Sequence, residues 1–214
     1  MLKIRAWLLR GIAVTGAALL ACLPAGAHPH MWVTVKATVL YANGAFVGIR
    51  HKWTFDEYYT ATAIEGLDKN KDGIYDRAEL AELAKVNIDA LKDFDYFTFP
   101  ALDGQAVKLG EPTDYWLEYK DGLLSLLFTT PFASPVLANA KGFTFSVHDP
   151  SFFIAFELAK ADKPVQLGEG APNTCHIKMD PAEQRDTAQL GPMQQLGGVV
   201  SLGQDIAVEC ETAK

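Results

Sequence analysis

The hydrophobic pattern of the chain begins with two segments in which apolar and polar residues alternate. Residues 31–41 carry apolar side chains at every second position from Val33 to Val39, and residues 46–53 continue in the same way. Alternation with a period of two predicts β-strands that bury one face. Asn43-Gly44 lies between the segments and favours a tight turn. The sequence therefore predicts an antiparallel hairpin.

A helical period replaces this alternation over residues 55–92. Tyr59, Ala63 and Leu67 recur at a spacing of four, and a second apolar set with helical spacing follows from Leu80 onward. Thr54, followed three residues later by glutamate, has the form of a capping box at the start of the first helix. We expect a helix-loop-helix unit inserted after the hairpin.

From residue 96 onward, short apolar segments alternate with turn signals. The expected strands are residues 96–99, 114–119, 123–130, 143–147, 152–158, 165–167, 175–179 and 206–209. Short, numerous and aromatic strands are typical of antiparallel sandwiches. We therefore expect an α+β fold, with one mainly antiparallel β-sandwich-like domain over residues 28–214. Residues 181–204, rich in Gln, Ala, Gly and Pro, predict a mobile or weakly structured segment.

The loop between the two predicted helices has the spacing of an EF-hand calcium loop. The expected ligands, at loop positions 1, 3, 5, 7, 9 and 12, are Asp68, Asn70, Asp72, the carbonyl of Ile74, Asp76 and Glu79. Gly73 at position 6 permits the sharp turn. Calcium takes six to eight oxygen ligands, which this spacing supplies. A solvated acidic turn is the alternative. Because the loop has no paired EF-hand, we expect a structural calcium site rather than a switch.

Residues 1–27 have the composition of a secretory signal peptide. Three basic residues precede an apolar run over residues 11–23, and Ala25-Gly26-Ala27 forms a small-x-small cleavage site. The run is too short to span a membrane, and no later segment is long enough. We expect cleavage after Ala27 and a soluble periplasmic protein. Lipid anchoring at Cys22 is the alternative.

Charge and cysteine content agree with export. The formal net charge is −7, and removal of a leader with three basic and no acidic residues lowers it to −10. Such acidity argues against nucleic acid as a partner. Cys175 and Cys210 remain after cleavage, and an even count in an oxidising compartment predicts a disulfide. A thiolate metal site at Cys175 and His176 is the alternative.

Cleavage after Ala27 would leave His28 at the N-terminus, with His30 two residues on. A terminal amine and imidazoles suit zinc, nickel or copper. Pro29 has no amide hydrogen, so the amino-terminal copper/nickel chelate that needs this nitrogen is excluded. His51 and His148-Asp149 are further candidate ligands, and the sequence leaves open whether they converge.

The sequence contains no nucleophile elbow, no zinc-protease helix and no phosphate-binding glycine loop. We therefore expect no enzymatic activity. A copper enzyme that uses His28 as a histidine brace with His148 is an alternative from a different class.

Four motifs occur in a fixed order: His28-Pro29-His30 after the leader, Trp53-Thr54-Phe55-Asp56 before a helix, the Asp68-x-Asn70-x-Asp72-Gly73 loop and His148-Asp149-Pro150. This order resembles a bacterial family of unknown function described as the periplasmic component of an uncharacterised ABC-type transport system. The resemblance covers essentially the whole mature chain. Members typically work with an inner-membrane permease of the nickel/cobalt class.

The resemblance implies an accessory protein for zinc, nickel or cobalt transport and an inner-membrane metal permease as its partner. It fixes neither the ion nor the direction of transport. A calcium-stabilised interaction module without a transition metal is the alternative.

Overall fold

The computed structural model describes residues 30–160, 163–179 and 204–211, and its strands form two sheets. The larger one, sheet A, contains β1 (Met31–Ala42), β2 (Ala45–Phe55), β5 (Tyr115–Lys120), β6 (Leu123–Leu137), β8 (Ile154–Leu158) and β9 (Val165–Leu167). Sheet B contains β3 (Thr98–Leu102), β4 (Gln105–Ala106), β7 (Phe143–Val147), β10 (Cys175–Met179) and β11 (Ile206–Cys210).

The strand order is β5-β6-β2-β1-β8 in sheet A, with β9 also paired to β1, and β10-β11-β7-β3-β4 in sheet B. All described pairs are antiparallel except those of β1 with β8 and β9, which are parallel. The β1–β2 hairpin turns at Asn43 (φ 50°) and Gly44 (φ 84°), which confirms the predicted turn. The described residues are mostly β, in two largely antiparallel sheets, so the mainly antiparallel part of the expected α+β fold is confirmed.

One face of sheet A forms the core. A row of inward side chains crosses four strands, with Val35 beside Trp53, Trp53 beside Leu126 and Leu126 beside Leu117. All four are at most 2% exposed. Phe46 stacks on Phe143 of β7 with ring centroids 5.5 Å apart, and this contact joins the two sheets.

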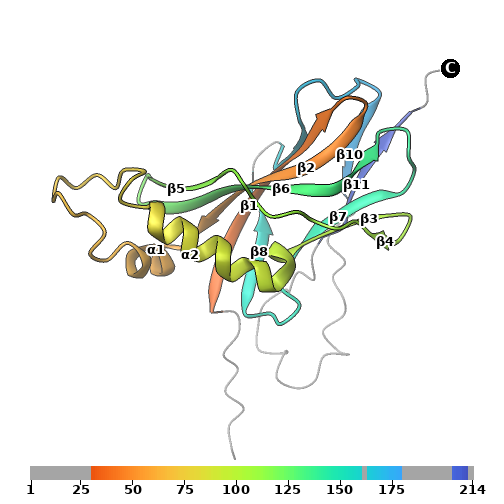
Figure 1. Ribbon diagram of the computed structural model, residues 1–214. Helices are drawn as coiled ribbons and strands as arrows, with labels where there is room; N and C mark the ends of the chain where they lie inside the picture. The colour runs from red at the N-terminus through yellow and green to blue at the C-terminus, as the bar shows by residue number, and fades with distance from the viewer. Residues whose placement is uncertain (1–29, 161–162, 180–203, 212–214) are drawn as a thin grey trace, which may run out of the picture.

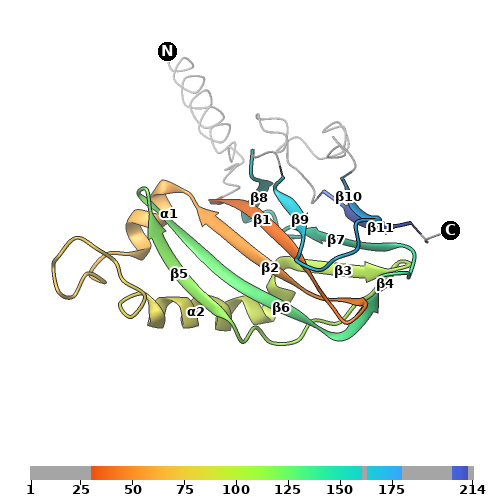
Figure 2. The same ribbon diagram turned by 90° about the horizontal axis from the view of Figure 1, so that it is seen from above.

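Two helices lie between β2 and β3 in the chain: α1 (Glu57–Ala63) and α2 (Ala81–Leu91). In Figures 1 and 2, α2 and sheet B lie on the same side of sheet A. Ala84 and Ile88 of α2 are buried, and the amide of Leu124 in β6 donates to the Thr60 hydroxyl of α1 at 3.1 Å. The helices therefore cover the part of sheet A that contains β5 and β6.

The start of α1 differs from the expected capping box. Thr54 belongs to β2, and its hydroxyl lies 2.9 Å from that of Ser125 in β6. Asp56 is the N-cap, and its carboxylate accepts from the amide of Tyr59 at 2.8 Å. The prediction for Thr54 was wrong because β2 continues to Phe55 and pairs that threonine within the sheet.

Two expected strands begin later than predicted, because left-handed residues precede them. Residues Lys92–Phe97 form a 3₁₀ turn, η1, that ends with Asp95, Tyr96 and Phe97 at φ of 50°, 52° and 45°. Strand β3 therefore starts at Thr98. Phe152 has φ of 59°, and β8 starts two residues after it. The expected strands at 143–147, 165–167 and 175–179 are confirmed.

The predicted leader (residues 1–27), the Cys22 anchor, His28 and residues 181–203 of the predicted mobile segment lie outside the described residues. No helix within the described ranges has the length and hydrophobicity needed to cross a membrane.

Candidate functional site

The acidic loop (residues 68–79) connects α1 to α2, and its carboxylates fold back onto its own backbone. The Glu79 carboxylate accepts from the amide of Lys69 at 2.9 Å. Asp68 accepts from the amide of Gly73 at 3.0 Å. Glu79, the last acid of the loop, thus bonds to the amide of Lys69, which directly follows the first acid, Asp68. This hydrogen bond closes the loop.

Three further candidate ligands bond inside the loop. The Asn70 side chain accepts from the Asp72 amide at 2.9 Å and donates to its carboxylate at 3.0 Å. Asp72 accepts from the amide of Ile74 at 2.8 Å. Asp76 accepts from the amide of Glu79 at 2.9 Å. The five predicted side-chain ligands therefore all accept hydrogen bonds from the backbone of the loop itself.

Gly73 has φ of 78°, and a Cβ built on it would meet nothing within 4 Å. The backbone conformation, rather than space, therefore requires glycine at this position.

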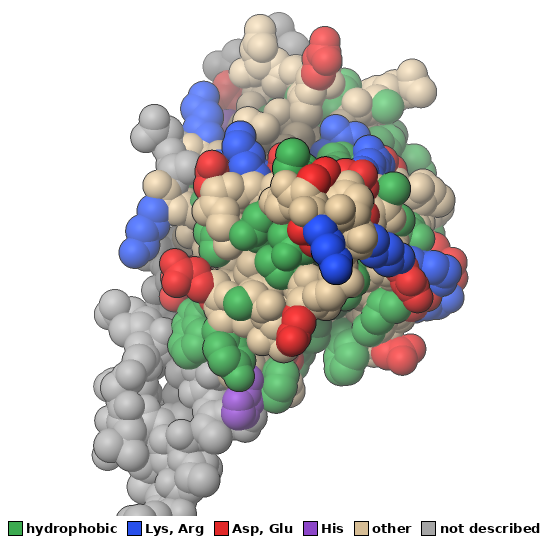
Figure 3. Space-filling view, turned by 90° about the vertical axis from the view of Figure 1, so that its left-hand side faces the viewer, with side chains coloured by type: hydrophobic (Ala, Val, Ile, Leu, Met, Phe, Trp, Pro, Cys, Tyr) green, Lys and Arg blue, Asp and Glu red, His purple; other side chains and the backbone are tan. Residues whose placement is uncertain are grey.

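Aromatic contacts hold the loop to sheet A. Tyr75 packs on Tyr119 of β5 with ring centroids 4.9 Å apart. The guanidinium of Arg77 lies 4.7 Å from the centre of the Trp116 ring, also on β5, in a cation–π contact. Any ion that orders the loop would therefore also order its attachment to β5. Figure 3 views this end of the molecule, where acidic and basic side chains are interspersed.

His30 is exposed at the start of β1. Its amide donates to the carbonyl of Phe153 at 2.9 Å, and its ring lies 4.8 Å from that of Phe153. His30, which follows His28-Pro29 in the sequence, is thus held at the surface next to the residue before β8.

His51 lies in the core on the inward face of β2. Its ring stacks on Phe128 at 4.7 Å, and Nε2 lies 3.4 Å from the hydroxyl of Thr98 and 3.5 Å from that of Thr130. Its Nδ1 and the Trp53 indole nitrogen are buried without a hydrogen-bond partner among the described residues. Burial lowers the pKa of His51 to about 3, so this imidazole is neutral at pH 7.

His148 follows β7 and is half-buried. Its Nδ1 lies 3.2 Å from the hydroxyl of Ser146, and its ring packs on Phe99 at 4.5 Å. Burial lowers the pKa of His148, while the charges of Asp205 and Asp149 oppose the shift. Asp205 was not predicted to act here, because 57 positions separate it from His148 and no local pattern connects them.

Asp149 holds the turn that leads into β8. Its carboxylate accepts from the amide and hydroxyl of Ser151 at 2.8 and 2.7 Å, and from the amide of Ile154 at 2.9 Å. Burial alone would raise the pKa of Asp149, but these hydrogen bonds stabilise the anion and lower it. The carboxylate therefore has a structural role in this turn.

The candidate ligands form no single cluster. Among the described residues, no group of three His, Cys, Asp or Glu side chains is placed to hold a metal ion. His51, His148 and Asp149 are each held by separate neighbours. The pairing of His28 with His30, and of His28 with His148 in a copper site, remains a prediction because His28 lies outside the described residues.

Cys175 and Cys210 form a disulfide that joins the paired strands β10 and β11, as predicted. Both sulfurs are bonded, so the alternative of a thiolate metal site at Cys175 and His176 is wrong. The His176 ring instead lies 3.4 Å from the carboxylate of Glu209.

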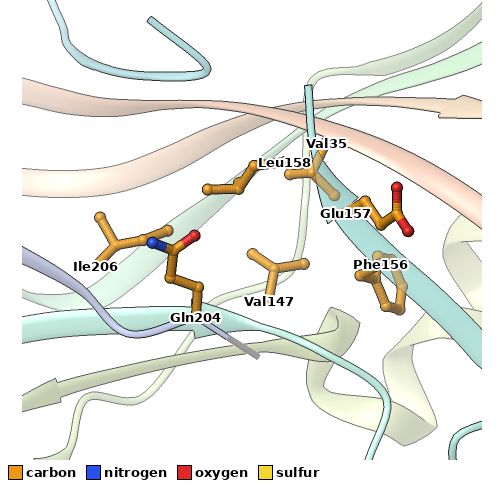
Figure 4. A pocket seen from close by; sticks show the side chains of 7 residues that line it. All are labelled: Val35, Val147, Phe156, Glu157, Leu158, Gln204 and Ile206. Carbon is orange, nitrogen blue, oxygen red and sulfur yellow. The ribbon is translucent and has the colours of Figure 1, made fainter. Parts of the chain in front are cut away.

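One cavity between the sheets is too small for a substrate. It has a volume of about 30 Å³ and lies between β1 and β8 on one side and β7 and β11 on the other (Figure 4). Val35, Val147 and Phe156 contribute apolar walls. Such a volume holds about one water molecule.

These features define a mostly β protein with two largely antiparallel sheets, a disulfide in the smaller sheet and an acidic loop between two helices. Residues 13–197 match the family described as "Protein of unknown function (DUF1007)", and the chain belongs to that family. The match covers the acidic loop, all five histidines and Cys175. A comparison with curated proteins finds no match.

Proposed function

We propose that the protein is a calcium-stabilised accessory protein that acts in the periplasm beside a transition-metal permease. The observation that carries the calcium site is the closed acidic loop, in which Glu79 reaches back to the amide of Lys69. The permease and the transported ion rest on the resemblance stated above and on the exposed His30.

Calcium binding is supported by the chemistry of the loop. Its donors are carboxylate, amide and carbonyl oxygens, which are the ligands that a hard cation prefers. Asp68, Asp72 and Glu79 accept from backbone amides and are not gathered around one point, so a cation would have to draw these oxygens together. In the proposed EF-hand-like unit, α1 and α2 would be the flanking helices.

Transition-metal binding is proposed at the start of β1. His30 is exposed there, and His28 is two residues before it. Imidazoles at an exposed position suit zinc or nickel, with copper as a further candidate. The Cys175–Cys210 disulfide supports an oxidising compartment such as the periplasm.

The second candidate is a calcium-stabilised interaction module that binds no transition metal. It is favoured by the separate positions of His51, with its ring between Phe128 and the threonine hydroxyls, and of His148, with its ring on Phe99. Both candidates are without enzymatic activity and share the calcium site.

Calorimetric titration of the exported protein with calcium, zinc and nickel tests the proposal. Glu79→Gln should abolish calcium binding, whereas Glu82→Gln, on the exposed first turn of α2, should keep it. His30→Ala should weaken zinc or nickel binding, and His176→Ala is its matched control on an exposed strand.

The outcomes separate the two candidates. If neither zinc nor nickel binds more tightly than about 10 µM, roughly −7 kcal/mol, the interaction module is the candidate function that remains. Competition between zinc and calcium for one site would contradict the proposal of two separate sites. Unchanged calcium binding in Glu79→Gln would remove the calcium site from both candidates.

A further inference from the structure

An open apolar groove of about 310 Å³ lies between the end of α2 with η1 and the turn before β8. Leu91, Phe94 and Phe97 line one side, and Phe153 and Ile154 line the other. Phe94 is 56% exposed and Phe153 is 48% exposed, although both are large apolar side chains. Figure 3 shows hydrophobic side chains gathered along the lower edge of this end of the molecule, next to a histidine.

A turn with left-handed residues lies beside each wall of the groove. In η1, Tyr96 and Phe97 have φ of 52° and 45°, and Phe152 has φ of 59° in the opposite turn. Residues other than glycine adopt this region at an energetic cost, and such strain is concentrated at binding sites. Phe94 and Phe153 lie next to these turns in the chain, and both keep about half of their surface exposed.

The neighbouring contacts show how this presentation is maintained. Phe97 is buried and stacks on Phe94 with ring centroids 5.2 Å apart, so the outer ring rests on an anchored one. On the other side, Asp149 binds the amide of Ile154 at 2.9 Å and fixes the turn that carries Phe153. The two exposed rings are therefore held in place.

The rim of the groove is acidic. Of the four aspartates in residues 87–97 and 148–154, Asp89 is paired with Lys85 and Asp149 is buried, which leaves Asp93 and Asp95 as the exposed acids. The one lysine of these two segments, Lys92, is paired with Glu111, which is also exposed. Asp93 and Asp95 are exposed on either side of Phe94 in the chain. An occupant that fits this surface must combine apolar side chains with positive charge.

We propose that this groove docks a basic amphipathic segment of another protein. Apolar side chains one helical turn apart would lie between Phe94 and Phe153, and lysines or arginines would face Asp93 and Asp95. A second copy of the chain fits less well, because two such rims would place aspartate against aspartate. The docking surface does not depend on calcium in the acidic loop.

Fluorescence anisotropy with two synthetic helical peptides tests the proposal. One peptide carries leucines at helical spacing on a lysine background, and the other carries the same leucines on a glutamate background. Only the lysine peptide should bind the full exported chain. Phe94→Ser and Phe153→Ser should each weaken binding about tenfold or more. Val86→Ser is the matched control, because Val86 is 58% exposed on α2 and does not line the groove.

The charged rim is tested separately. The double variant Asp93→Asn, Asp95→Asn should weaken binding of the lysine peptide and reduce its dependence on salt. Because these side chains are exposed, this variant keeps the apolar groove and supplies a test that is independent of the phenylalanines. Unchanged affinity and salt dependence would contradict the assignment of a basic partner.

Other occupants would be recognised by their own results. Equal binding of both peptides, or binding unchanged in Phe94→Ser, would overturn the proposal. Self-association in sedimentation that Phe94→Ser abolishes would assign the groove to a second copy. A photocrosslinker at position 94 that captures the N-terminal segment of the same chain would assign it to that segment.

Discussion

The carboxylate of Asp56 connects the start of α1 to the start of β1. Its Oδ2 accepts from the amide of Trp32 at 2.8 Å, and its Oδ1 accepts from the amide of Tyr59 at 2.8 Å. The amide of Asp56 also donates to the carbonyl of Trp32 at 3.1 Å. One side chain thus fixes the helix that leads to the acidic loop against the strand that follows His30.

Asp56→Ala should lower the free energy of unfolding by about 1–3 kcal/mol, because it removes the helix cap and leaves the Trp32 amide without this acceptor. Urea denaturation measures the change. Glu57→Ala, at the next and exposed position, is the control and should change stability by less than about 0.5 kcal/mol. Equal effects of the two substitutions would contradict the role of Asp56.

Calcium should stabilise the fold through the acidic loop. At a concentration tenfold above the dissociation constant, binding to the folded state adds roughly 1.4 kcal/mol. This corresponds to a rise in melting temperature of about 3–5 °C. Asp68→Ala should abolish the rise in a thermal scan, whereas His30→Ala should leave it intact. A calcium-dependent rise that persists in Asp68→Ala would contradict the site.

The buried His51 should make the protein sensitive to acid. Its pKa of about 3 in the folded state lies well below the usual value of 6.5. As the pH falls below 6.5, the His51 imidazole binds a proton in the unfolded chain but stays neutral in the folded chain. The free energy of unfolding therefore falls as the pH decreases towards 3. The loss is about 1.4 kcal/mol per pH unit.

His51→Phe should remove this contribution and flatten the dependence of stability on pH between 6 and 4. Urea denaturation at several pH values measures the slope for the parent and the variant. An identical slope in the two proteins would show that His51 takes up its proton equally in the folded and unfolded states.

The disulfide should account for a substantial part of the stability of sheet B. Cys175 and Cys210 are 35 positions apart in sequence, and in the chain-entropy account a loop of this length contributes roughly 3–4 kcal/mol. Replacement of both cysteines by serine should lower the urea midpoint accordingly. Reduction of the parent protein should produce the same shift. A reduced parent that unfolds at the midpoint of the oxidised one would contradict this contribution.

The elements that local pattern determines were predictable. Alternation predicted β1 and β2, and the oxygen-bearing residues at 68–79 predicted the acidic loop between two helices. The cap of α1 was misassigned because Thr54 and Asp56 both suit an N-cap. The choice between them depends on how far β2 remains paired with β6, which is a tertiary contact.

For one candidate histidine, the sequence pattern did contain a signal. His51 shares the inward face of β2 with Ile49 and Trp53, so the alternation itself contained the signal for a buried position. For Phe94 and Phe153 the sequence offered no such signal. They lie beside left-handed residues other than glycine, Asp95 and Phe152, and no local motif indicates that backbone conformation.

The parallel pairing of β1 with β8 has a consequence for the order in which the chain acquires its structure. Met31 lies beside Ile154, 123 positions later in the sequence. Contacts between such distant segments form slowly, because the intervening chain must first be ordered. During synthesis, the β1–β2 hairpin is complete long before β8 emerges. The outer edge of β1 then exposes unpaired amides and carbonyls that can pair with another chain. A newly made chain therefore needs protection along β1 until its C-terminal third has been synthesised.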